Sequence, residues 1–102
     1  MKAENSKEER ITIMFEDERI RIEKIESFGV CSPKDFWYDQ AEEEWVLLMQ
    51  GSARLMFDTG ETLTLRDGQS FTIPAHVKHR VDETSADAVW MCVFEKGSKS
   101  ST

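Results

Sequence analysis

Short strand-like segments, separated by turns that contain glycine, restrict this chain to a narrow set of folds. Apolar and polar residues alternate over 62–66 and 69–73, and a dense apolar run over 44–50 ends at Gly51. Strands are expected at residues 19–25, 44–50, 53–57, 62–66, 69–73, 80–81 and 88–94. Short strands at such close and regular spacing are typical of a β-sandwich or a closed β-barrel, and they argue against an alternation of strands and helices. The pattern therefore predicts an all-β fold.

The length of 102 residues predicts a single domain with a single core. Residues 1–10 are polar and charged and residues 97–102 are small and polar, so both are expected to be mobile tails around a barrel domain of residues 11–96. A short helix over residues 7–14 is an alternative for the first segment. The strand around residues 20–25 is expected to pair with a second copy of the chain, which predicts a homodimer, because an unpaired strand edge invites a partner.

Charge and hydropathy exclude several classes of partner. The chain has 13 basic and 20 acidic residues, a formal net charge of −7, and a surface of this sign repels the phosphates of nucleic acids. The apolar runs are too short to span a membrane, and the first residues lack a signal-peptide core, which predicts a cytoplasmic protein. The two cysteines, Cys31 and Cys92, are expected to pack as small apolar side chains and not to form a disulfide. A nucleophilic pair of Cys92 and His79 is the alternative.

Polar side chains at alternating positions precede the apolar run over 44–50. Tyr38, Gln40 and Glu44 share one face if this segment is extended, because strand residues two or four apart point the same way. Glu44 leads directly into an apolar strand, where an ionised carboxylate needs a partner or a metal ion. These three residues are therefore candidates for a polar pocket.

Two histidines follow the expected strand over 69–73. His79 is expected to point inward beside Glu44, and an imidazole next to a carboxylate in a partly dry cleft is suited to proton transfer near neutral pH. His76 is expected at the rim of the same pocket, and Trp37 in its wall. Five aromatic residues form either a wall for a ligand or, as we prefer, core and dimer contacts: Phe36, Trp37, Trp45, Phe71 and Trp90.

Both segments resemble the two sequence motifs of the cupin superfamily. Glu44 and Gly51 match the second half of the first motif, and Tyr38 and Gln40 stand where its paired histidines are normally found. The second motif is matched by Gly68, Pro74 and His79, whereas His76 replaces its second glycine and Glu83 its asparagine. The segments 37–40 and 44–47 also resemble the signature of a subgroup of small single-domain bacterial cupins. The resemblance covers residues 19–95 and implies a double-stranded β-helix, the jelly-roll barrel of this superfamily.

The resemblance also implies a site and a chemistry. Cupin metal sites typically use three histidines and one glutamate, of which this chain keeps His79 and Glu44. It therefore implies a weak divalent metal site for Zn²⁺, Mn²⁺ or Ni²⁺ at His79, Glu44, Gln40 and Tyr38, with Asp39 as a substitute ligand in a shifted register. The expected function is the binding of a small polar molecule.

If the protein is an enzyme, the expected chemistry is non-redox, as in an isomerase, lyase or hydrolase, with Glu44 or Tyr38 moving a proton. The first alternative is a metal-free module that binds or senses a small ligand through a degenerate cupin site. A dimeric scaffold without a ligand is the second alternative.

Overall fold

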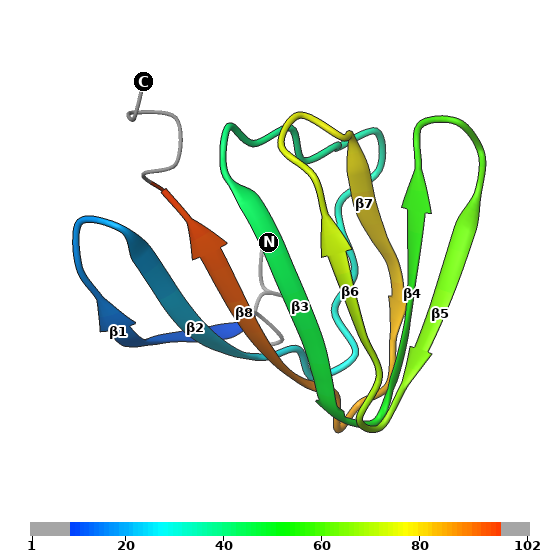
Figure 1. Ribbon diagram of the computed structural model, residues 1–102. Coiled ribbons are helices and arrows are strands. Elements are labelled where there is room, and N and C mark those ends of the chain that lie inside the picture. Colours follow the sequence, from blue (N-terminus) through cyan, green and yellow to red (C-terminus); the bar gives the residue numbers. More distant parts are fainter. Residues whose placement is uncertain (1–8, 97–102) are drawn as a thin grey trace.

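The computed structural model describes residues 9–96, and this part of the chain consists of strands and loops. The strands are β1 (Arg10–Glu16), β2 (Ile20–Glu26), β3 (Glu43–Gln50), β4 (Ser52–Phe57), β5 (Thr62–Arg66), β6 (Ser70–Ile73), β7 (His79–Thr84) and β8 (Val89–Glu95). They form a five-stranded sheet in the order β1-β2-β8-β3-β6 and a three-stranded sheet in the order β5-β4-β7. Figure 1 shows the two sheets converging at the lower end of the view and diverging at the upper end. This architecture confirms the all-β jelly-roll prediction, and residues 9–96 include no helix that spans a membrane.

The core lies between the two sheets and follows the alternation of the sequence. On β3, Val46 and Leu48 are buried whereas Trp45 and Met49 are exposed, because successive side chains of a strand point to opposite faces. The remaining core side chains come from both sheets and include Ala53, Leu55, Leu65, Ile73, Ala88, Trp90, Cys92 and Phe94. Leu48, with 0% of its surface exposed, lies in this core.

A glycine in the left-handed region makes the tight turn between β3 and β4. Gly51 has φ 93°, and a Cβ built on it would lie 2.4 Å from Ser85 Oγ and 3.0 Å from Ala88 Cα. Glycine is required here both by the backbone conformation and by the close approach of the β7–β8 loop. The turn predicted at residues 50–52 is confirmed.

The N-terminal strand differs from the sequence prediction. Residues 10–14 belong to β1 and not to a helix, because Ile11, Thr12 and Ile13 favour a strand and pair with β2. Glu9 and Arg10, which we assigned to the tail, lie in the described part of the chain. The other predicted tail residues, 1–8 and 97–102, lie outside the described residues.

One further strand boundary and one sheet edge also differ from the prediction. β7 extends to Thr84, so the predicted loop over 82–87 is shorter, because Glu83 and Thr84 pair with Arg54 and Ala53 of β4. β2 pairs with both β1 and β8, so the strand around residues 20–25 has no free edge for a partner subunit. The free edge on this side of the five-stranded sheet belongs to β1.

Candidate functional site

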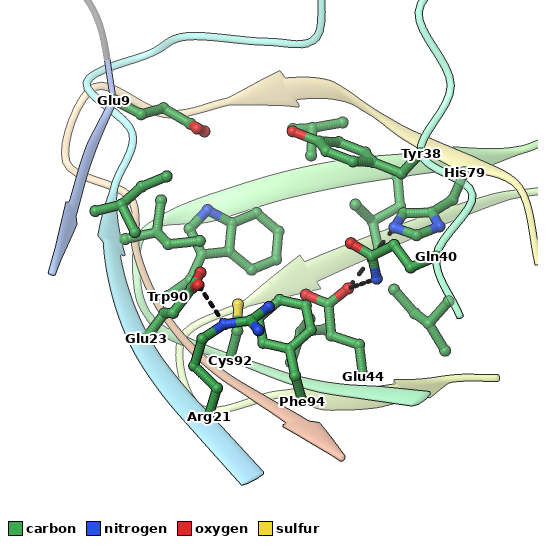
Figure 2. Close-up of a pocket in the computed structure, with 16 residues that line it drawn as sticks. Glu9, Arg21, Glu23, Tyr38, Gln40, Glu44, His79, Trp90, Cys92 and Phe94 are labelled. Carbon is green, nitrogen blue, oxygen red and sulfur yellow. Dashed lines mark hydrogen bonds and ion pairs between the residues drawn. The ribbon is translucent and has the colours of Figure 1, made fainter. Parts of the chain in front are cut away.

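A pocket of about 250 Å³ opens between the two sheets. One part of its wall is apolar and is formed by Ile11, Ile25, Val46, Leu55, Ile73, Val81, Trp90 and Phe94. The other part carries the polar groups Glu9, Arg21, Glu23, Tyr38, Gln40, Glu44, His79 and Cys92 (Figure 2). A concave, mostly apolar site with a few convergent polar groups is the usual form of a small-molecule pocket.

The loop between β2 and β3 runs beside the edge strand β7 and positions two of these polar side chains, Tyr38 and His79. Tyr38 forms an isolated bridge with His79, in which the Tyr38 N–H donates to the His79 carbonyl at 2.7 Å and the His79 N–H to the Tyr38 carbonyl at 3.1 Å. Their rings stack with centroids 5.3 Å apart. Arg80 holds the same loop by donating to the carbonyls of Ser32 and Pro33. The imidazole is therefore fixed from its backbone and from one face of its ring.

The protonation state of His79 follows from its neighbours. Nδ1 lies 2.9 Å from the carbonyl oxygen of Val77, which only accepts, so this nitrogen carries the proton of the neutral ring. Nε2 is then left with a lone pair, and it lies 3.8 Å from Glu44 Oε1. Both side chains are buried, with 6% and 9% of their surfaces exposed.

Glu44 combines a buried carboxyl with few compensating contacts. Burial raises its pKa above the ordinary value of 4.5, and a hydrogen bond from the Gln40 amide at 3.1 Å offsets part of this effect, as would His79 in its protonated form. Cys92 also lies against Glu44, and burial together with this carboxyl raises the pKa of the thiol well above its usual range. A thiol held protonated in this way is a poor nucleophile, so the alternative of a Cys92–His79 nucleophilic pair is not supported.

The structure places the predicted site residues in two groups. Tyr38, Gln40, Glu44 and His79 line the same pocket, in which Figure 2 shows the Tyr38 hydroxyl directed toward Glu9 and away from Glu44. Burial raises the pKa of Tyr38, and Glu9 and Glu44 add to the shift.

His76 and Trp37 do not line the pocket. The His76 side chain is 69% exposed and its Nδ1 lies 3.0 Å from Asp39 Oδ1, on the outer side of the loop. Trp37 lies near Arg80, with the guanidinium 5.9 Å from its ring. The cause is the alternation along residues 37–40, which turns Trp37 and Asp39 away when Tyr38 and Gln40 point inward. Of the five aromatic residues considered as a wall, Trp90 lines the pocket.

Sequence reasoning missed the charged residues that β2 contributes. Arg21 donates through Nε to Glu23 at 2.8 Å and through both terminal nitrogens to Glu42 at 3.2 Å, and it lies 4.3 Å above the Phe94 ring. The alternation over residues 19–25 is a signal for the shared face of Arg21, Glu23 and Ile25. The pairing of β2 with β8, which turns that face toward the pocket, is a long-range contact without a local signal.

Glu9 was missed for a different reason, because it belongs to the segment that composition assigns to the tail. A chain of hydrogen bonds holds it: the Trp90 indole N–H donates to Ser27 Oγ at 3.0 Å, and the Ser27 hydroxyl donates to Glu9 Oε2 at 3.4 Å. Burial raises the pKa of Glu9, and the bond from Ser27 opposes this shift. The sequence carries no local signal for this chain.

The donor set does not fit a tightly held divalent metal ion. Within residues 9–96, no three His, Cys, Asp or Glu side chains lie close enough together to hold one. Of the four expected ligands, Tyr38 turns its hydroxyl away, which leaves His79, Glu44 and the weakly binding amide oxygen of Gln40, whose amide nitrogen donates to Glu44. Catalytic zinc sites use three protein ligands, and the substitute Asp39 is engaged with His76 outside the pocket.

Comparisons with known proteins agree with this fold. A family model described as a cupin domain matches residues 31–94. A crystal structure of a proposed mannose-6-phosphate isomerase from Ralstonia eutropha is 34% identical, with a TM-score of 0.82 over 86% of this chain and 84% of that chain. KdgF from a Halomonas species shares the fold at 14% identity, with a TM-score of 0.76 over 93% of this chain and 86% of that chain. An RmlC-like cupin from Shewanella frigidimarina does so at 15% identity, with a TM-score of 0.71 over 94% of this chain and 83% of that chain.

No curated protein sequence matches the chain. The cupin model covers more than half of the sequence, and the Ralstonia structure adds a similarity over most of both chains. The chain therefore belongs to the cupin family.

Proposed function

We propose that this cupin binds a small polar molecule in the pocket between its sheets and that it does so without a resident metal ion. The observation that carries the proposal is the convergence of Tyr38, Gln40, Glu44 and His79 on a cavity of about 250 Å³ whose opposite wall is apolar. A small ligand buries its carbon skeleton against the apolar wall, and its polar groups are oriented by the four side chains. This is the metal-free alternative of the sequence analysis, and it is supported by the poor fit of the donor set to a metal ion.

A phosphorylated sugar, suggested by the name of the Ralstonia relative, suits this pocket less well. A phosphate group requires a cation or several free backbone N–H groups. Arg21 is the one permanently charged cation among the described lining residues, and Glu23 and Glu42 already hold it. The charges that line the pocket therefore do not support a phosphorylated sugar as the ligand of this chain.

Proton transfer is a second candidate function, and one observation favours it. The lone pair of His79 Nε2 faces a buried carboxyl whose pKa is raised above its ordinary value by burial, so the site places a proton acceptor beside a carboxyl that holds its proton more strongly than a free one. A ligand with an acidic C–H or O–H next to Nε2 would lose a proton to His79 and regain one from Glu44. This step is non-redox and belongs to isomerase or lyase chemistry.

We also propose that the protein is a homodimer joined through β1. This strand offers a free edge and four half-exposed apolar side chains, Ile11, Ile13, Met14 and Phe15. Antiparallel pairing of two β1 strands about Ile13 sets Arg10 opposite Glu16 of the partner subunit, so the edge is complementary to itself in charge. The occupant of this edge is therefore a second copy of the chain.

The metal-free proposal is tested by elemental analysis of tag-free protein before and after incubation with Zn²⁺, Mn²⁺ or Ni²⁺. We expect no stoichiometric metal in the wild-type protein, since two good ligands hold an ion weakly. Glu44→Gln and His79→Asn serve as the matched variants, and they are expected to give the same metal content as the wild type. Roughly one equivalent of metal in the wild type, lost in both variants, would support the metal site of the sequence analysis instead.

A further inference from the structure

The charges that line the pocket are unbalanced toward the negative. Three carboxyl groups, Glu9, Glu23 and Glu44, face one guanidinium, Arg21. Arg21 is bound by Glu23 and in a bidentate manner by Glu42, so this cation is neutralised inside the protein. Burial raises the pKa of both Glu44 and Glu9, and even with both counted as neutral, Glu23 and Glu42 outnumber Arg21. The potential inside the pocket therefore favours a positively charged ligand.

One corner of the pocket is suited to a cation. The Glu9 carboxylate and the Tyr38 hydroxyl are directed toward each other in Figure 2, with the Trp90 ring system between them and the β8 strand. The bonds from Trp90 through Ser27 fix the Glu9 carboxylate, and both Ser27 and Trp90 are buried. A carboxylate and a phenol oxygen on two sides of one space suit an ammonium ion, which pairs with the charge of the first and donates a hydrogen bond to the second. Glu9, Tyr38 and Trp90 are called the Glu9 corner below.

The opposite part of the pocket offers an unused hydrogen-bonding group. Only 6% of the His79 side-chain surface is exposed, and its Nε2 makes no hydrogen bond within residues 9–96. The nearest oxygen, Glu44 Oε1, is 3.8 Å away, beyond hydrogen-bond distance. The lone pair of Nε2 is therefore open to the pocket, where a ligand hydroxyl can donate a hydrogen bond to it.

We propose that the ligand is a small hydroxylated amine, with its positively charged nitrogen in the Glu9 corner and a hydroxyl group donating to His79 Nε2. The inference rests on the proposed pocket function and names the class of molecule that the pocket takes. The two recognition points lie on different elements, since Glu9 precedes β1 and His79 begins β7. The apolar part of the same pocket wall, which includes Val46, Leu55 and Ile73, suits a carbon skeleton that carries the two groups.

The test compares three probes of one shape that differ in charge. These are trans-4-aminocyclohexanol, cyclohexane-1,4-diol and 4-hydroxycyclohexanecarboxylate, titrated into the full-length ¹⁵N-labelled chain at pH 7.5. The indole N–H signal of Trp90 is the main readout, because Trp90 lines the pocket and is bonded to Ser27. Glu9→Gln removes the charge and keeps the shape, and Glu43→Gln is the matched control, since Glu43 is exposed on β3 and lies outside the pocket lining.

We expect the amine to bind about tenfold more tightly than the diol or the hydroxy acid, as for a partly buried charge pair. Glu9→Gln is expected to reduce the affinity for the amine to that for the diol, whereas Glu43→Gln leaves the preference unchanged. Equal binding of the diol or the acid, or a preference that survives in Glu9→Gln, would overturn the amine inference and leave the pocket proposal standing. No change at Trp90 or at residues 38–44 with any probe would overturn both.

Discussion

At the scale of single residues, the buried carboxyl of Glu44 makes stability depend on pH. Its folded-state pKa is raised by burial above the ordinary 4.5, so the folded protein binds this proton more readily than the unfolded chain. The contribution of Glu44 to the free energy of unfolding is therefore largest at acid pH and is lost as the pH rises through the folded-state pKa. Glu44→Gln keeps the shape and removes this loss, so the stability of the variant relative to the wild type is expected to increase from pH 4.5 to pH 7.5.

Urea unfolding, followed by tryptophan fluorescence at several pH values, measures this difference. Glu43→Gln on the exposed side of β3 is the control and is expected to show no comparable trend. A relative stability of Glu44→Gln that stays constant or falls over this range would contradict the assignment of burial as the dominant influence on Glu44.

Two glycines with the same backbone conformation separate strain from crowding. Gly51 and Gly60 both have positive φ, but a Cβ on Gly51 would meet Ser85, Asp87 and Ala88, whereas a Cβ on Gly60 meets nothing within 4 Å. Gly60→Ala is expected to lower the free energy of unfolding by about 1–2 kcal/mol through backbone strain alone. Gly51→Ala adds overpacking and is expected to cost about 2–5 kcal/mol in total. Chemical denaturation of both variants checks the difference, and equal losses would argue against the close approach at Gly51.

At the scale of secondary-structure elements, β1 is the strand on which the proposed homodimer depends. Ile13 pairs with Glu23 of β2 and is half-exposed, so Ile13→Lys places a charge on the proposed interface with little cost to the isolated subunit. The variant is expected to be monomeric at concentrations at which the wild type is dimeric, as measured by analytical ultracentrifugation. Met49→Lys is the matched control on β3, since Met49 is similarly exposed. A monomeric wild type, or a dimer that persists in Ile13→Lys, would exclude this interface.

The elements also show which parts of the site are readable from a sequence. The strands that carry Glu44 and His79 were predicted because alternation and glycine turns are local signals, and the shared face of Tyr38, Gln40 and Glu44 follows from the same period. Arg21 was not predicted because it reaches the pocket through the pairing of β2 with β8, and Glu9 because hydrogen bonds from the distant Ser27 and Trp90 hold it there. Trp37 and His76 show the converse: proximity along the chain to a pocket residue does not place a side chain inside the pocket.

At the scale of the whole molecule, the fold brings both ends of the described chain to one cavity. Residues from β1, β2, β3, β4, β6, β7 and β8 contribute to the lining, and β8 lies between β2 and β3 in the larger sheet. All-β character and family motifs were sufficient to predict the jelly-roll architecture. The charge inside the cavity depends on which distant strands pair with one another. The class of ligand was therefore inferred from the structure and could not be predicted from the sequence.

The central position of β8 has a consequence for the order of events during synthesis. The growing polypeptide completes β1 to β7 before β8 leaves the ribosome, and until then β2 and β3 have no strand to join them. Trp90, which anchors Ser27 and through it Glu9, is also made at this last stage. The proposed ligand pocket is therefore complete in a nascent chain only after β8 has been inserted between β2 and β3. A ligand in the cell would then bind only chains in which β8 is in place, and this binding would stabilise them against unfolding.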